Sequence, residues 1–184
     1  AELTTLVLKI PGGSDANVLT LESPIAANEK GTRYEVSFEA GPSVWAGALQ
    51  RTTAADGLQI DLLREDGSVL AGFRHNPGAW SGTKDAQKLK PAGFPYTGDG
   101  SGKLRIRLTS ATPGSGHFGG AIDDLAITTH KTTIYTENFD ALKPSPTEGA
   151  QADTRLRVLA GVSVPGWAGG GINHSHAVDL GGGD

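Results

Sequence analysis

The chain has 184 residues and a formal charge of −4, which leaves no basic field to attract the phosphates of a nucleic acid or an anionic membrane. It has no cysteine for a disulfide or for thiol chemistry, and no apolar run approaches the roughly 20 residues that span a bilayer. Its 27 glycines are well above the usual share of roughly 7%, as many short strands joined by tight turns would require.

Methionine is also absent, even at position 1. We therefore expect a chain that was processed or excised, with a removed signal peptide as one explanation. A soluble, exported protein, extracellular or at the cell surface, is the corresponding expectation.

The first part of the chain predicts short strands. Residues 3–10 and 18–22 are rich in leucine and β-branched residues and end at turn-forming residues. The clearest period-two alternation covers residues 34–40 and predicts a strand with its acids facing outward. Its inward positions are Tyr34, Val36 and Phe38.

The middle of the chain alternates strands with loops. Residues 41–53 are predicted as a polar loop or irregular strand, and residues 58–63 and 69–73 as a hairpin turning at Asp66-Gly67. Residues 75–97 are predicted as a long loop and 104–108 as a strand. No segment has helical periodicity, so the sequence predicts an all-β protein.

The last third contains a strand interrupted by two acids and a change of character after it. A glycine-rich turn leads into residues 118–127, which contain Asp123 and Asp124, and a second strand follows at 133–140. Residues 141–155 are predicted as a long loop. Two further strands are expected near residues 156–159 and 177–180, with Pro165-Gly166-Trp167 between them.

Several of these motifs resemble those of galactose-binding-like jelly rolls, the β-sandwiches of many carbohydrate-binding modules and cell-surface proteins. The matching motifs are Gly31-x-x-Tyr34-x-Val36-x-Phe38, Gly119-x-x-Ile122-Asp123-Asp124-Leu125, Glu137-x-Phe139, Pro165-Gly166-Trp167 and His176-Ala177-Val178-Asp179-Leu180. The resemblance implies an antiparallel β-sandwich of jelly-roll type with a buried Trp167. In that family the last three motifs precede the first, so this chain has the two halves in inverted order.

The inverted order predicts two parts of one sandwich. Residues 1–127 form its larger part, and residues 128–184 supply the first-half strands that complete it. The completion is either within the chain, as in a circular permutant, or in a neighbouring copy, as in head-to-tail strand exchange. A third alternative is a slice from a tandem array. A bare half-sandwich would expose unpaired edges and its apolar face, so some form of completion is expected.

Catalysis has little support in the sequence. Asp123 and Asp124 are neighbours on a predicted strand and would point to opposite faces, so they could not act as an acid and base pair. His174 and His176 could share one face of a strand as a metal pair, but no further ligand motif accompanies them and a polar loop is the simpler interpretation. No serine-nucleophile motif is present. We expect a protein that is not an enzyme.

The resemblance also implies a structural Ca²⁺ ion where the first and last strands meet. The matching oxygen donors are Asp123, Asp124, Glu137, Asn138 and Asp140. In the alternative interpretation, one aspartate caps a turn and the other faces solvent.

Carbohydrate binding needs exposed aromatic rings and nearby polar groups. Candidates in the predicted loops are Trp45, Trp80 and Tyr96, with His75 and Asn76 close by in sequence. Alternatively, Trp45 and Trp80 anchor their loops in a small secondary core.

The sequence therefore predicts a non-catalytic extracellular structural protein, a cell-surface or filament subunit whose partners are other copies of itself, assembled head to tail by strand complementation. The alternative is a carbohydrate-binding module of a larger secreted or surface protein, with glycans as partners.

Overall fold

A computed structural model describes residues 4–9, 18–42, 44–45, 50–51, 54, 56–76, 78–79, 89–110, 118–130, 132–139, 157–160, 164–169 and 175–179. Every regular element in these ranges is a strand, which confirms the all-β prediction. In the same ranges no helix has the length and apolar character needed to cross a bilayer.

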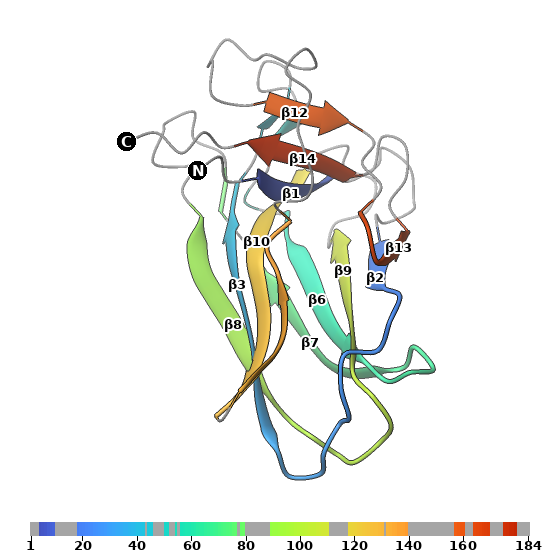
Figure 1. The fold of residues 1–184 in the computed structure, drawn as a ribbon. Coiled ribbons are helices and arrows are strands. Elements are labelled where there is room, and N and C mark those ends of the chain that lie inside the picture. The colour runs from blue at the N-terminus through green and yellow to red at the C-terminus, as the bar shows by residue number, and fades with distance from the viewer. Residues whose placement is uncertain are drawn as a thin grey trace.

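The strands form two main antiparallel sheets (Figure 1). The larger sheet has the order β12 (Arg157–Ala160), β14 (Ser175–Asp179), β1 (Thr4–Lys9), β10 (Phe118–Thr129), β3 (Arg33–Gly41) and β8 (Lys90–Thr97), with β11 (Thr133–Glu137) beside β10. The smaller sheet has the order β13 (Trp167–Gly169), β2 (Val18–Leu21), β9 (Arg105–Ser110), β6 (Leu58–Leu63) and β7 (Val69–His75). A separate pair joins β4 (Val44–Trp45) to β5 (Gln50–Arg51).

The hydrophobic core combines the inner faces of both sheets. Val36 and Phe38 of the larger sheet and Ile60 and Leu62 of the smaller one are at most 2% exposed and belong to the same cluster. The rings of Phe73 on β7 and Phe94 on β8 stack with centroids 5.5 Å apart, which links the two sheets at one side. This two-sheet arrangement is consistent with a β-sandwich.

Local patterning places most strands where the sequence predicted them. Alternation along β3 buries Tyr34, Val36 and Phe38 and leaves Glu35 exposed, as expected. β6 and β7 form the predicted hairpin, and Gly67 in its turn has φ of 86°. Such a positive φ is readily adopted only by a residue without a Cβ.

The prediction of a continuous loop over residues 75–97 is wrong at its C-terminal end. β8 pairs with β3 from Lys90 to Thr97, although Pro91 and Pro95 lie within it. Proline lacks the N–H that a central strand needs, but an edge strand tolerates it where that position faces outward. β8 is the last strand of its sheet, so the prolines fit there.

β10 is shared by three neighbours. β3 runs along one side of it, while β1 and β11 lie end to end along the other, pairing with residues 118–122 and 125–128 respectively. Between these two stretches the register with β3 shifts, and Asp124 adopts a φ of 46°. The strict alternation expected for Asp123 and Asp124 therefore fails at this bulge.

The C-terminal strands pair with the N-terminal strands of the same chain. β14 lies beside β1, with Thr4 opposite Asp179, and β12 lies outside β14 (Figure 1). β13 lies beside β2, with Trp167 opposite Leu21. Trp167 is 4% exposed and belongs to the main core, as the resemblance implied.

Candidate functional site

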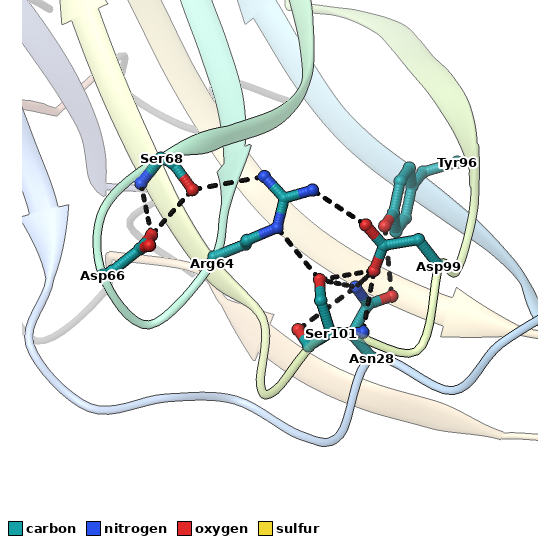
Figure 2. Close-up of polar contacts among 7 residues, drawn as sticks. All are labelled: Asn28, Arg64, Asp66, Ser68, Tyr96, Asp99 and Ser101. Atoms are coloured by element: carbon teal, nitrogen blue, oxygen red, sulfur yellow. Dashed lines mark hydrogen bonds and ion pairs between the residues drawn. The ribbon is translucent and has the colours of Figure 1, made fainter.

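A polar network joins three loops at one end of the sandwich (Figure 2). Asn28 is 2% exposed and donates from Nδ2 to Oδ1 of Asp99 at 2.6 Å, while the Tyr96 hydroxyl donates to Asn28 Oδ1 at 3.1 Å. A buried amide is costly unless its donors and acceptor are satisfied, and here both sides of the amide have partners.

Arg64 connects this amide cluster to the β6–β7 turn. Its guanidinium donates to Asp99 Oδ2 at 2.9 Å, to Ser101 Oγ at 3.0 Å and to Ser68 Oγ at 3.2 Å (Figure 2). The Ser101 hydroxyl and amide both donate to Asp99, and together with Arg64 they lower the pKa of Asp99 to about 2. Asp99 is thus ionised at neutral pH and acts as an acceptor rather than a proton donor.

The loop geometry behind this network depends on glycine. A Cβ on Gly98 would lie 2.0 Å from the backbone oxygen of Glu29, and Gly100 and Gly102 have φ of 86° and 63°. Backbone hydrogen bonds from Gly98 to Thr32 and from Gly31 to Gly98 close the contact between the two loops. These residues fix loop positions, and each polar group named so far is engaged in doing so.

No motif in the sequence predicted this network. One pattern could have indicated it, because Asp66-Gly67-Ser68 and Asp99-Gly100-Ser101 repeat the same tripeptide. In both, the aspartate accepts from the amide and the hydroxyl of the serine two positions later. Such aspartate turns are local signals, but their connection through Arg64 and Asn28 depends on the tertiary fold.

A concavity of about 330 Å³ lies between the loop of residues 26–32 and the β10–β11 turn. The Tyr34 hydroxyl holds one wall by donating to Ala27 O and accepting from Glu29 N, both at 3.0 Å. No lysine or arginine is among the described residues that line it. They are Ala26, Ala27, Glu29, Thr32, Tyr34, Thr129, His130, Thr132 and Ile134.

The predicted carbohydrate residues are not brought together as one described site. Tyr96 stacks on Tyr34 at 6.0 Å, whereas half-buried His75 packs edge-on against Phe38 at 5.5 Å. Tyr34 and Phe38 are four residues apart on β3, so these two contacts are separated by roughly 13 Å along the strand. Burial also lowers the pKa of His75.

The other three carbohydrate candidates give no sugar platform in the described part of the chain. Asn76 donates to Ala54 O and accepts from Gly78 N, which supports its own loop. Trp45 pairs with Gln50 in the short β4–β5 ladder, but its side chain lies outside what is described, and Trp80 lies entirely outside the described residues.

Of the predicted calcium residues, Asp123 and Asp124 lie on β10, and Glu137 is the last residue of β11, opposite Leu125 of β10. Asp123 is 3% exposed and accepts from Asp124 N at 2.8 Å, while Glu137 accepts from Phe139 N at 2.9 Å. Asp124 and Asn138 are exposed, and Asp140 lies outside the described residues. The exposed Asp124 agrees with the alternative interpretation, whereas Asp123 is buried within β10 and caps no turn there.

The β10–β11 junction has no described group of metal ligands and has an unusual backbone conformation. Across the ranges that the structure describes, no group of three or more histidine, cysteine or acidic side chains is placed to hold a metal ion. The non-glycine residues Asp124 and Phe139 both have positive φ, at 46° and 55°. Such conformations are uncommon and persist only where surrounding contacts enforce them. The calcium ion thus remains a prediction. At the two histidines considered as a metal pair, His174 lies outside the described residues and only the backbone of His176 in β14 is described.

An aromatic contact joins β11 to the C-terminal strands. The rings of Phe139 and Trp167 are 6.3 Å apart, and Tyr135 packs against the same core. Burial, with a smaller contribution from the charge of Glu137, raises the pKa of Tyr135. Tyr135 Oη and Trp167 Nε1 are both buried without a hydrogen-bond partner in the described structure.

No protein-family model matches the chain, and a search of curated proteins finds no similar sequence.

Proposed function

We propose that the protein is a non-catalytic extracellular structural module, a permuted or strand-exchanged jelly roll whose copies assemble head to tail by strand complementation. The observation that supports this is the position of residues 157–179. They supply the outermost strands beside β1 and β2, at one margin of both sheets. As a subunit of a cell-surface layer or filament, the protein would have other copies of itself as its partners.

Without those strands, the rest of the chain would expose unpaired strand edges and part of its hydrophobic core, which another segment could cover. β1 and β2 would become open edges, and the core would lose Val164 and Trp167, which are 3% and 4% exposed. Open edges recruit strands, and a fully buried aromatic residue is a typical binding anchor. The same segment from a second copy would meet the same contacts. Because donor and acceptor surfaces differ, such contacts need not close and can propagate into a filament.

A cysteine pair tests this proposal cleanly, because the natural chain has no cysteine. Thr20 and Ala168 are opposite each other on β2 and β13. Opposed residues on antiparallel strands have Cα atoms about 4.5–5.5 Å apart, within the range of a disulfide. With Thr20→Cys and Ala168→Cys in one chain, oxidation should give covalent multimers on a non-reducing gel. Monomers containing only an internal disulfide would contradict assembly by exchange.

The absence of catalysis is also part of the proposal. Its support is that the polar residues described above bind one another or the backbone in order to hold loops. Incubation with model glycosides and esters should give no turnover above that of a heat-denatured sample.

Calcium at the β10–β11 junction is a component of the same proposal. The residues that would bind it are Asp123, Asp124, Glu137, Asn138 and Asp140, and carboxylate and amide oxygens are donors that this ion prefers. Adding Ca²⁺ to chelator-treated protein should raise its melting temperature. An unchanged melting temperature together with no heat in a calorimetric titration would count against the ion.

The second candidate function, a carbohydrate-binding module, is favoured by the concavity at residues 26–34 and 129–134. It combines apolar surface, including Ile134, with hydroxyl, carboxylate and imidazole groups and no cation among the described lining residues. That mixture suits a neutral ligand with apolar and hydroxylated faces. Retention on insoluble polysaccharides should fall with Ile134→Asp and persist with Val69→Asp, which is on an exposed position of β7. No retention of the natural chain would exclude this candidate.

A further inference from the structure

We infer that the exchanged unit begins after Phe139, so that β11 remains on its own chain as part of the acceptor for the C-terminal segment of a second copy. This inference rests on the proposed function and refines it. The inverted order of the motifs suggested that the completing segment begins near residue 128, before β11. The structure points to a boundary between Phe139 and Arg157 instead.

β11 is tied to β10 by a tight turn. Thr129 N donates to Thr132 O at 2.8 Å, and Thr132 N donates to Thr129 Oγ1 at 3.2 Å. The pairing continues from Thr128 opposite Thr133 to Leu125 opposite Glu137. For β11 to join another copy, this turn would have to open and the whole ladder would have to be replaced. Exchange of a segment that begins after Phe139 leaves this turn and this ladder intact.

The end of β11 is also inserted into the core of the body. Phe139 is 1% exposed and belongs to the core cluster that contains Val36 and Phe38 of β3 as well as Trp167. Its amide is held by Glu137 Oε1 at 2.9 Å, and its φ of 55° turns the chain at this point. Residues 132–139 therefore form one unit with β10 and β3.

The acceptor surface that results consists of Leu21, Tyr135 and Phe139, which each lie against Trp167 or the core around it. Trp167 covers this surface, with its ring 6.3 Å from that of Phe139 and its backbone opposite Leu21. Glu22 N also donates to Gly166 O at 2.9 Å. The occupant is preorganised, because Trp167 N donates to Val164 O at 3.0 Å and Gly166 has φ of 82°. Residues 164–169 of a second copy are the partner that this acceptor surface fits, since the chain's own segment occupies it with these contacts.

Two cysteine pairs in the full chain locate the boundary. Ala126 and Thr136 are opposite each other on β10 and β11, as Thr20 and Ala168 are on β2 and β13. We expect an internal disulfide for Ala126→Cys/Thr136→Cys and intermolecular disulfides for Thr20→Cys/Ala168→Cys. Intermolecular disulfides at both pairs would retain exchange but place β11 in the exchanged unit, which overturns the inference. Internal disulfides at both pairs would show that no strands are exchanged, which contradicts both the proposed function and this inference.

Mixing two full-length variants provides an independent readout. Phe139→Ala damages the acceptor and Trp167→Ala damages the donor, so neither variant alone can form an intact site, within one copy or between copies. If Phe139 belongs to the acceptor, a mixture gains an intact site made of Phe139 from one variant and Trp167 from the other, and this site exists only between chains. We therefore expect more dimer in the mixture than in either variant alone by sedimentation velocity. If both residues belong to the exchanged unit, no combination restores an intact site. A mixture with no more dimer than either variant alone would overturn the inference, and circular dichroism of each variant confirms that its β-structure is retained.

Discussion

Two arginine–carboxylate pairs of almost equal length differ in their access to water. Arg107 Nη2 lies 2.8 Å from Asp61 Oδ2, and the two side chains are 30% and 7% exposed. Arg33 Nη2 lies 2.9 Å from Glu35 Oε1, and these side chains are 70% and 48% exposed. Asp61 also accepts from Gln59 at 2.9 Å, so it is enclosed by donors on the outer face of the smaller sheet.

Removing the arginine should therefore have different consequences at the two sites. Arg107→Met leaves a buried carboxylate without its cation and should lower the free energy of unfolding by about 3 kcal/mol or more. Arg33→Met is the matched control and should lower it by less than about 1 kcal/mol, because exposed pairs contribute little. Urea denaturation of both variants measures the difference. Equal losses would show that burial does not govern these pairs.

Asp99 makes stability depend on pH in a defined window. Its pKa is about 2 in the folded protein against an ordinary value of 3.8, so folding favours the ionised form. The stabilisation is fully present above 3.8 and is lost as the pH falls through about 2. Asp99→Asn should therefore lose less stability than the natural protein between pH 5 and pH 2 in urea titrations. Ser101→Ala, which removes the first donor, should change the profile in the same direction, and unchanged profiles would contradict the assignment.

At the scale of strands, the edge strand β8 depends on the close approach of its backbone to β3. Gly93 is opposite Ser37, and a Cβ at this position would lie 2.4 Å from the carbonyl oxygen of Val36. A backbone oxygen cannot move aside as a flexible side chain can. Gly93→Ala should thus lower the melting temperature, although alanine has the better intrinsic strand fit, while Thr97→Ala at the exposed end of the same strand should have little effect. A melting temperature at or above that of the natural protein would show that β8 can shift outward.

Elements with a strong local pattern could be predicted from the sequence. The alternation of β3 and the Asp66-Gly67 hairpin follow from residue types within a few positions, whereas the burial of Trp167 was implied by the family resemblance. The strand β8 was not predicted because its prolines are tolerated only at a sheet edge. The local sequence does not show which strand will lie at an edge.

Some residues of the candidate site could also be placed from the sequence, and others could not. The pairing of β10 with β11 follows from two neighbouring strands joined by a short polar connector, and it brings Glu137 opposite Leu125. The Asn28–Arg64–Asp99 network was not expected, since its members are 35 or more positions apart and meet only after the sheets have packed. The bulge at Asp124 likewise depends on how β10 divides its edge between β1 and β11.

At the scale of the whole molecule, assembly depends on the pairing between the N-terminal and C-terminal strands of the described chain. Thr4 and Asp179 are direct neighbours on β1 and β14. A strand at one end of the sequence thus lies between β10 and a strand from the other end. The same set of pairings is available within one copy or between copies, so protein concentration should decide their balance if exchange occurs.

Sedimentation velocity of the natural protein across a wide concentration range, followed by electron microscopy of the most concentrated sample, is the most direct test of assembly by strand complementation. We expect species larger than a monomer to increase with concentration and to appear as linear chains of globular subunits. A single monomeric species at every concentration, with isolated particles in the micrographs, would contradict the proposed structural role.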